Sequence, residues 1–243
     1  MTLKIKYVLL LFFLAKLSFG QEKKFSVSDF DTAYLQEMKS ENAALSSRIK
    51  TFPANVQELN KQIGQALRGK NDSKVLELAI EADKIYPNNA DIKHFKGKMQ
   101  AKLSEYDAAL KSFDEAITLN PKNKWFYVDK ATVLADNGQT QEALKTVEKL
   151  NSLYPDWSIG HNIKAALLHT LNKNDEALKS YNLAVNAMPK SAQILTNRAD
   201  LYLVLNKESE AISDYKAALK IQPDYSRAQE KLDAISKTTI SQK

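Results

Sequence analysis

All six prolines of this 243-residue chain stand 34 residues apart. Proline lacks a backbone amide donor and clashes inside a helix, and it favours extended geometry in the residue before it. A proline at a fixed period therefore marks the point where one structural unit ends and the next begins. The spacing predicts a chain of stacked repeats, a class that usually works by presenting a surface. The six positions are Pro53, Pro87, Pro121, Pro155, Pro189 and Pro223.

Small residues recur at the same period and indicate helices. Ala109, Leu110, Phe113, Ala116 and Ile117 follow the i, i+1, i+4, i+7, i+8 spacing of one helix face. Each repeat is therefore expected to be two helices, whose backbones approach closely where the small residues stand. One column of small residues is Gly97, Ala131, Ala165 and Ala199, and a second is Ala109, Ala143, Ala177 and Ala211. Turns are expected near Leu103–Ser104, Asn137–Gly138, Leu171–Asn172 and Leu205–Asn206.

Three segments resemble the tetratricopeptide repeat: Glu105–Asn123, Asn174–Pro189 and Arg198–Pro223. The resemblance implies an all-α fold, a right-handed α-solenoid of helix-turn-helix repeats with a capping helix at each end. The first repeat departs from the family's residue sizes at Ile63, Val75 and Ala79. Divergent ends are expected in a solenoid, because a terminal repeat packs on one side only. The five expected repeats are 56–89, 90–123, 124–157, 158–191 and 192–225.

The first twenty residues have the features of a secretory signal peptide. Lys4 and Lys6 precede the apolar segment Tyr7–Ala15, and Ser18 and Gly20 supply small residues before an expected cleavage at Gln21. A retained membrane anchor is the alternative, although the apolar segment is short for a bilayer span. The segment predicts export, most simply to the periplasm of a bacterium, and the junction resembles those of exported Bacteroidota proteins.

The two ends of the mature chain are expected to carry helices of their own. An approximate helical stripe from Asp29 to Lys50 lies in the N-terminal segment 21–55. This stripe fits either a lone helix that covers the first repeat or a degenerate sixth repeat. Segment 226–243 is expected to be a capping helix with a disordered tail, because Ala228, Leu232 and Ile235 form a helical stripe.

Composition and motifs argue against catalysis and against nucleic-acid binding. Loss of the signal peptide leaves 32 basic and 29 acidic residues, and these charges are interleaved along helices. The chain has no cysteine and no glycine-rich phosphate loop. Its three histidines, His94, His161 and His169, do not have the spacing of a helical metal pair. We therefore expect a non-enzymatic protein with no cofactor, no metal site and no stable membrane insertion after cleavage.

The family resemblance also implies where a partner would bind. In tetratricopeptide proteins the first helix of each repeat lines a concave groove that holds an extended peptide or a helix. Trp125 is either a groove anchor, because tryptophan is common at binding hot spots, or a packing residue between repeats. The positions that this register places on the groove are Asn60, His94, Lys98, Trp125, Asp129, Asn162, His169, Asn197 and Asp200.

The expected function is that of a scaffold for protein–protein interaction in the bacterial envelope, with a protein or peptide partner in the groove. One alternative is a membrane-tethered assembly factor that keeps its N-terminal segment. Another is a protein that binds small ligands or cell-wall fragments through Trp125 and its neighbours.

Overall fold

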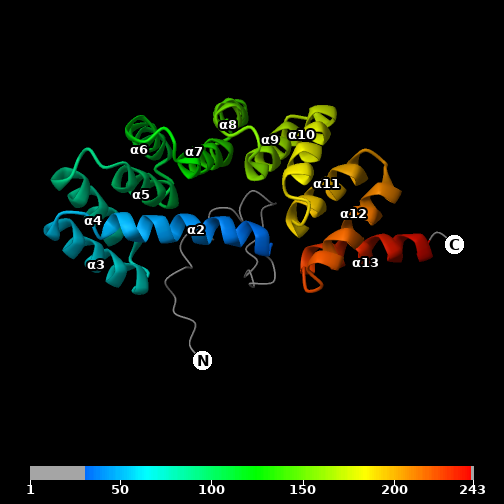
Figure 1. Ribbon diagram of the computed structural model, residues 1–243, viewed down its shortest axis with the longest axis horizontal. Helices are drawn as coiled ribbons and strands as arrows, with labels where there is room; N and C mark the ends of the chain where they lie inside the picture. The colour runs from blue at the N-terminus through cyan, green and yellow to red at the C-terminus, as the bar shows by residue number, and fades with distance from the viewer. Residues whose placement is uncertain (1–30, 242–243) are drawn as a thin grey trace. The chain divides into compact units, whose positions relative to one another are not determined.

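The computed structural model describes residues 31–241, and these residues form twelve helices and no strand (Figure 1). The predicted signal peptide lies outside the described residues. The all-α repeat fold expected from the proline period is confirmed. The helices are α2 (Thr32–Ile49), α3 (Ala54–Arg68), α4 (Asp72–Ile85), α5 (Ala90–Lys102), α6 (Tyr106–Leu119), α7 (Lys124–Asp136), α8 (Thr140–Leu153), α9 (Ser158–Thr170), α10 (Asn174–Ala187), α11 (Ala192–Val204), α12 (Glu208–Ile221) and α13 (Ser226–Ser241).

The described chain divides into two compact units. Unit 1 contains residues 40–153, which are helices α3 to α8 and the second part of α2. Unit 2 contains residues 31–39 and 154–241, which are helices α9 to α13 and the first part of α2. In unit 1 the pairs are α3 with α4, α5 with α6 and α7 with α8, and in unit 2 they are α9 with α10 and α11 with α12. Each of these hairpins is one sequence repeat.

The turn inside each hairpin contains one residue in the left-handed backbone region. In the second hairpin, Ser104 has φ 65° and its N–H donates to the Ala101 carbonyl at 3.0 Å, while the Glu105 N–H donates to Gln100 at 2.8 Å. This pair of bonds is a Schellman motif, which satisfies carbonyls left free at the end of a helix. The left-handed residues are Lys70, Ser104, Gly138, Asn172 and Asn206, which again stand 34 residues apart.

All six prolines are exposed and lie between helices. Four of them stand between the second helix of one repeat and the first helix of the next, whereas Pro53 lies between α2 and α3 and Pro223 lies between α12 and α13. Two residues after Pro87 and Pro121, the side chains of Asn89 and Asn123 accept hydrogen bonds from helix N–H groups at 3.0 Å. Ser191 does the same for α11 at 3.1 Å. At these three junctions a proline followed by a capping residue therefore ends one repeat and starts the next.

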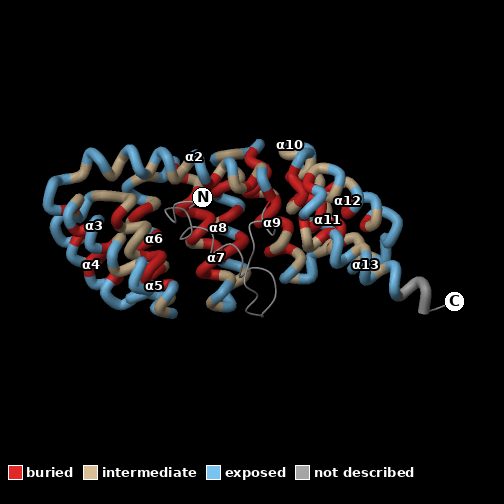
Figure 2. The backbone as a smooth tube through the Cα atoms, turned by 90° about the horizontal axis from the view of Figure 1, so that it is seen from below, coloured by how far each residue is buried: buried red, intermediate tan, exposed pale blue. Residues whose placement is uncertain are grey.

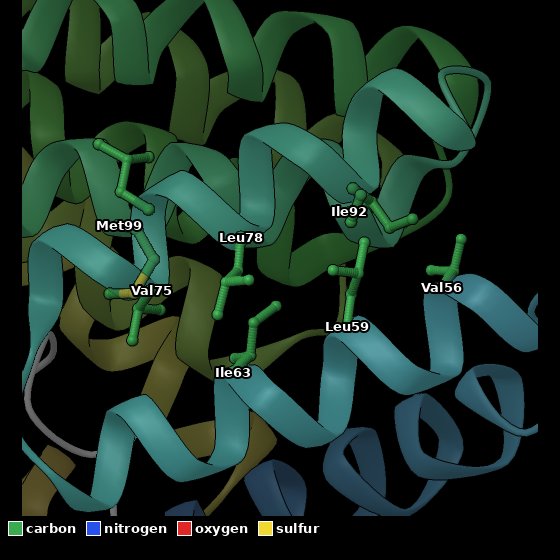
Figure 3. Packing of buried hydrophobic residues seen from close by; sticks show 9 residues of the cluster. Val56, Leu59, Ile63, Val75, Leu78, Ile92 and Met99 are labelled. Carbon is green, nitrogen blue, oxygen red and sulfur yellow. The ribbon is translucent and has the colours of Figure 1, made fainter.

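The core of unit 1 fills the space between successive hairpins. Figure 3 shows Val56, Leu59 and Ile63 of α3 pointing toward side chains of α4 and α5, among them Leu78 and Met99. The first repeat, although it departs from the family pattern, thus has a regular apolar core.

Close helix packing explains the columns of small residues. A Cβ atom added to Gly97 would lie 2.9 Å from the Phe113 ring and 3.1 Å from the Ala109 carbonyl oxygen. Both Ala109 and Phe113 are fully buried. The position of Gly97 therefore has no room for a side chain, because the large ring of the facing helix already fills it.

Unit 2 repeats this design with tyrosine as the large residue. Tyr215 and Tyr225 are almost fully buried in a cluster with alanines of α11 and α12. Ala228 of α13 belongs to the same cluster, and Leu232 and Ile235 pack against it. Helix α13 therefore covers the apolar face of the α11–α12 hairpin, as a capping helix should.

Helix α2 is a single helix that leads through Pro53 directly into α3. The described part of segment 21–55 therefore contains one helix and no second helix to complete a repeat. Figure 2 shows the second part of α2 exposed or intermediate, whereas α7 is mostly buried. In its first part, Tyr34 and Met38 are buried in unit 2.

Candidate functional site

Five of the predicted groove residues lie in unit 1, and four of them are on the first helices of two adjacent repeats. His94 and Lys98 come from α5, and Trp125 and Asp129 come from α7. The Nε2 atom of His94 lies 2.7 Å from Oδ2 of Asp129, and the Lys98 Nζ lies 3.5 Å from the same oxygen. We call His94, Lys98 and Asp129 the unit 1 polar cluster. The helix register brings these three together because one helical turn separates His94 from Lys98.

Aromatic rings hold His94 in place within the unit 1 polar cluster. The centroid of its imidazole lies 4.5 Å from that of the Phe126 ring and 5.6 Å from that of the Phe113 ring. Burial alone would raise the pKa of the Asp129 carboxyl. The charge of Lys98 and the hydrogen bond to His94 outweigh burial, so the pKa is held below its ordinary value. Asp129 is therefore an ionised carboxylate that already has two partners.

Unit 2 carries a second cluster at the equivalent repeat positions. The Nδ2 of Asn197 on α11 donates to Oδ1 of Asn162 on α9 at 2.9 Å. Asn162 and Asn197 stand two repeat lengths after His94 and Asp129, and each pair is separated by 35 residues. The same contact between neighbouring first helices thus recurs along the repeats, first as an ionisable pair and then as an amide pair.

The cap helix α13 extends this second cluster. The Arg227 guanidinium donates to Oδ1 of Asn197 at 2.8 Å and pairs with Asp200. The Tyr215 hydroxyl donates to Asp200 at 2.5 Å, and Lys231 lies 3.4 Å from the same carboxylate. We call Asn162, Asn197, Asp200 and Arg227 the unit 2 polar cluster. Asp200 is its centre, because three donors converge on it.

Burial keeps the tyrosines around Asp200 protonated. Burial raises the pKa of the Tyr225 hydroxyl to about 12, against the opposing charge of Arg227. Burial and the hydrogen bond to Asp200 likewise raise the pKa of Tyr215 above its ordinary value. Both hydroxyls therefore stay protonated at neutral pH, and the Tyr215 hydroxyl acts as a hydrogen-bond donor in the fold.

The remaining predicted residues lie outside the two clusters. Asn60 is exposed on α3, and His169 is half-buried on α9, where its Nδ1 lies 2.8 Å from Oδ1 of Asn174. The Trp125 side chain is only 4% exposed. The structure thus brings together six of the nine residues as two separate clusters. Asn60, His94, His169, Asn197 and Asp200 keep at least partial exposure to solvent.

Sequence reasoning missed the role of Arg227. The sequence predicts only a capping helix in segment 226–243, whereas the Arg227 guanidinium binds two of the predicted groove residues. The repeat spacing did indicate that Arg227 belongs to the groove positions, because it stands three repeat lengths after Trp125. Helix α13 therefore continues the first-helix register of the repeats, which places Arg227 on the predicted groove.

The described residues offer little for other kinds of site. Within 31–241, no group of three or more histidine or carboxylate side chains could hold a metal ion. None of the described helices is both long and apolar enough to cross a bilayer. Unit 1 has two shallow hollows. Lys93, Glu115 and Leu119 are among the residues that line the first, and Tyr127 and Lys149 are among those that line the second. Trp125 lines neither hollow.

Comparison of the sequence with known families gives the same assignment as the hairpins. Residues 100–167 match one sequence model of the tetratricopeptide repeat, and residues 192–225 match another. The chain belongs to the tetratricopeptide repeat family. None of the curated proteins matches the sequence as a relative.

Solved structures of tetratricopeptide proteins share the fold. MamA (41-end) from Desulfovibrio magneticus RS-1 has a TM-score of 0.60 at 15% identity, over 70% of this chain and 97% of its own. TTC0263, a thermophilic protein of Thermus thermophilus, has a TM-score of 0.58 at 19% identity, over 74% of this chain and 97% of its own. YrrB, described as having an unusual peptide-binding site, has a TM-score of 0.54 at 19% identity, over 70% of this chain and 88% of its own. At these identities the similarity establishes the fold alone.

Proposed function

We propose that this tetratricopeptide protein is a non-catalytic scaffold for protein–protein interaction in the bacterial envelope, with a peptide or helix of its partner bound along the first helices of the repeats. Repeats of this family generally bind protein or peptide partners. The fold supports the proposal, because the first helix of every hairpin follows the same register.

The observation that carries the proposal is the recurrence of polar pairs at equivalent positions of the first helices. The pair of His94 and Asp129 and the pair of Asn162 and Asn197 fix donors and acceptors in place. Polar groups that are already held cost less entropy to bind than mobile ones. A partner is therefore expected to be held by hydrogen bonds, with few charged contacts, since Asp129 and Asp200 already have cationic partners.

Site-directed crosslinking tests the binding surface. A photoreactive amino acid at Asn60 or at His169 lies on the first helices α3 and α9, and Lys216, exposed on the second helix α12, is the matched control. Crosslinking in the native envelope should give the same protein adduct from Asn60 and His169 and none from Lys216. An adduct from Lys216 alone would place the binding surface on the second helices and refute the proposal.

The envelope location rests on the features of residues 1–20. A positive start, a nine-residue apolar segment and small residues before Gln21 are the parts of a cleavable export signal. Sequencing of the N-terminus of the protein purified from its native host should begin at Gln21. A chain that retains Met1 would instead favour the membrane-tethered assembly factor.

A further inference from the structure

The second part of α2 is attached to unit 1 quite differently from the way the repeats pack on one another. None of the residues 40–49 is buried, whereas nine residues of α7 are. Leu45 and Ile49 are only half-buried. Apolar burial therefore contributes little to this contact, and its polar groups become decisive.

Four side chains form one continuous polar chain across this contact. The Arg48 guanidinium donates to the two carboxylate oxygens of Asp91 at 2.7 and 2.9 Å. Arg48 also donates to Glu41 at 2.8 Å, and Glu41 accepts a hydrogen bond from Nδ2 of Asn123 at 3.1 Å. Asp91 belongs to the first turn of α5, and Asn123 caps α7. Arg48 on α2 thus binds Asp91 at the start of α5, and Glu41 on α2 binds Asn123 at the start of α7.

The spacing of the two α2 residues is that of a single helix face. Glu41 and Arg48 are seven residues apart, about two helical turns, so both point to the same side of α2. The Nε–H and Nη2–H groups of the Arg48 guanidinium donate to the two oxygens of the Asp91 carboxylate, which carries the opposite charge. A helix with a carboxylate and a guanidinium at this spacing is therefore what the edge formed by Asp91 and Asn123 accommodates.

The contact is also built to be reversible. The side chains of Arg48 and Glu41 are 36% and 22% exposed, so water and salt screen this pair, whereas that of Asp91 is 11% exposed. If residues 40–49 leave, Asp91 loses its cation and Asn123 loses its acceptor, while the α5–α8 core remains as it is. A segment without a buried residue can thus be exchanged without unfolding the repeats.

We propose that the edge formed by Asp91 and Asn123 is a docking surface for a helix of a partner protein that carries a carboxylate and an arginine seven residues apart. Residues 40–49 of α2 occupy this surface as a placeholder when the partner is absent. The inference rests on the proposed scaffold function and specifies the partner class for this part of unit 1.

Release of the placeholder is measured by amide hydrogen exchange on the full chain. Arg48→Glu turns the attraction to Asp91 and Glu41 into repulsion, so the amides of residues 40–49 should exchange at least tenfold faster than in the unchanged chain. Lys50→Glu makes the same charge change at an exposed residue outside the polar chain, and it should leave exchange unchanged. Protection of α5 to α8 reports that the repeats stay folded in both variants. Equal exchange of residues 40–49 in the two variants would overturn the proposal.

Docking in trans is measured with a fluorescent peptide of residues 40–52, which carries both Glu41 and Arg48. It should bind the full-length Arg48→Glu chain at least tenfold more tightly than the Lys50→Glu chain, because the attached segment no longer competes. A peptide with Arg48→Glu should not bind either chain. Absence of saturable binding to the Arg48→Glu chain, or equal affinity for both chains, would refute the docking surface. Either result leaves the scaffold function standing, because that function is tested by crosslinking to an external partner.

Discussion

Among individual residues, Asp129 has the environment most unlike that of a surface carboxylate. It is 7% exposed, and its two partners, His94 and Lys98, both come from the neighbouring repeat. Because those partners hold its pKa below the ordinary value of 3.8, the charged form is favoured in the folded chain relative to the unfolded chain. The ionised carboxylate therefore contributes stability that depends on pH.

This contribution predicts the acid behaviour of an Asp129→Asn variant. Near pH 7 the variant should be less stable by about 1–3 kcal/mol, because Lys98 loses its charged partner. The stability that Asp129 gives the unchanged chain is complete above the ordinary carboxyl pKa and is lost as the pH falls through the lower pKa of the folded state. The difference between the two proteins should therefore shrink as the pH falls from about 5 to about 2.

Urea unfolding across this pH range measures the difference. Asp107→Asn is the control, because Asp107 is an exposed carboxylate in the first turn of the neighbouring helix α6. A constant difference between Asp129→Asn and the unchanged chain at all pH values would show that Asp129 is not a specially stabilised carboxylate.

The candidate site shows how far residue-level prediction reaches. The resemblance to the tetratricopeptide repeat, applied in the 34-residue register, placed His94, Lys98 and Asp129 on one face of adjacent helices. The register did not show that these groups would bond to one another and be almost buried, since depth depends on how closely two helices pack. Arg227 was missed for a related reason, because its long side chain reaches across to α11.

At the scale of the helices, the turn inside the hairpin is the element that repeats most faithfully. Each hairpin turn contains a residue with positive φ, but only Gly138 is glycine. Left-handed geometry costs other residues roughly 1 kcal/mol, which asparagine tolerates better than most. Proline and small-residue columns predicted where helices end, because they act through backbone geometry. A lysine at position 70 gives no such signal, so the first turn was not predicted.

Gly138→Ala should therefore destabilise the α7–α8 hairpin by about 1 kcal/mol. No atom lies within 4 Å of the Cβ that alanine would add, so the cost comes from the backbone φ of 75° alone. Gly69→Ala is the matched control, because Gly69 caps α3 in the ordinary right-handed region with φ −77°. Thermal unfolding of both variants should show a lower melting temperature for Gly138→Ala only. Equal melting temperatures would mean that residue 138 does not need left-handed geometry.

At the scale of a whole unit, stability should spread from repeat to repeat, because inside each unit a hairpin contacts mainly its neighbours in sequence. The C-terminal end of unit 2 allows this dependence of each repeat on its neighbour to be tested. Helix α13 buries Ala228 in the α11–α12 cluster and places Arg227 on Asp200. Without α13, the apolar face of the α11–α12 hairpin would be exposed to water, and the Asp200 carboxylate would lose its Arg227 partner.

A chain that ends at Tyr225 should therefore lose protection locally. Amides of α11 and α12 should exchange at least tenfold faster than in the full chain, while those of α3 and α4 keep their rates, because nearest-neighbour coupling weakens with each repeat. A chain shortened only by residues 238–243 is the control, since it keeps Ala228, Leu232 and Ile235. If the first truncation accelerated exchange equally in α3 and α12, the chain would unfold as one cooperative block. In that case a partner bound at one repeat would stabilise every other repeat equally, and binding would be coupled along the whole chain instead of remaining local.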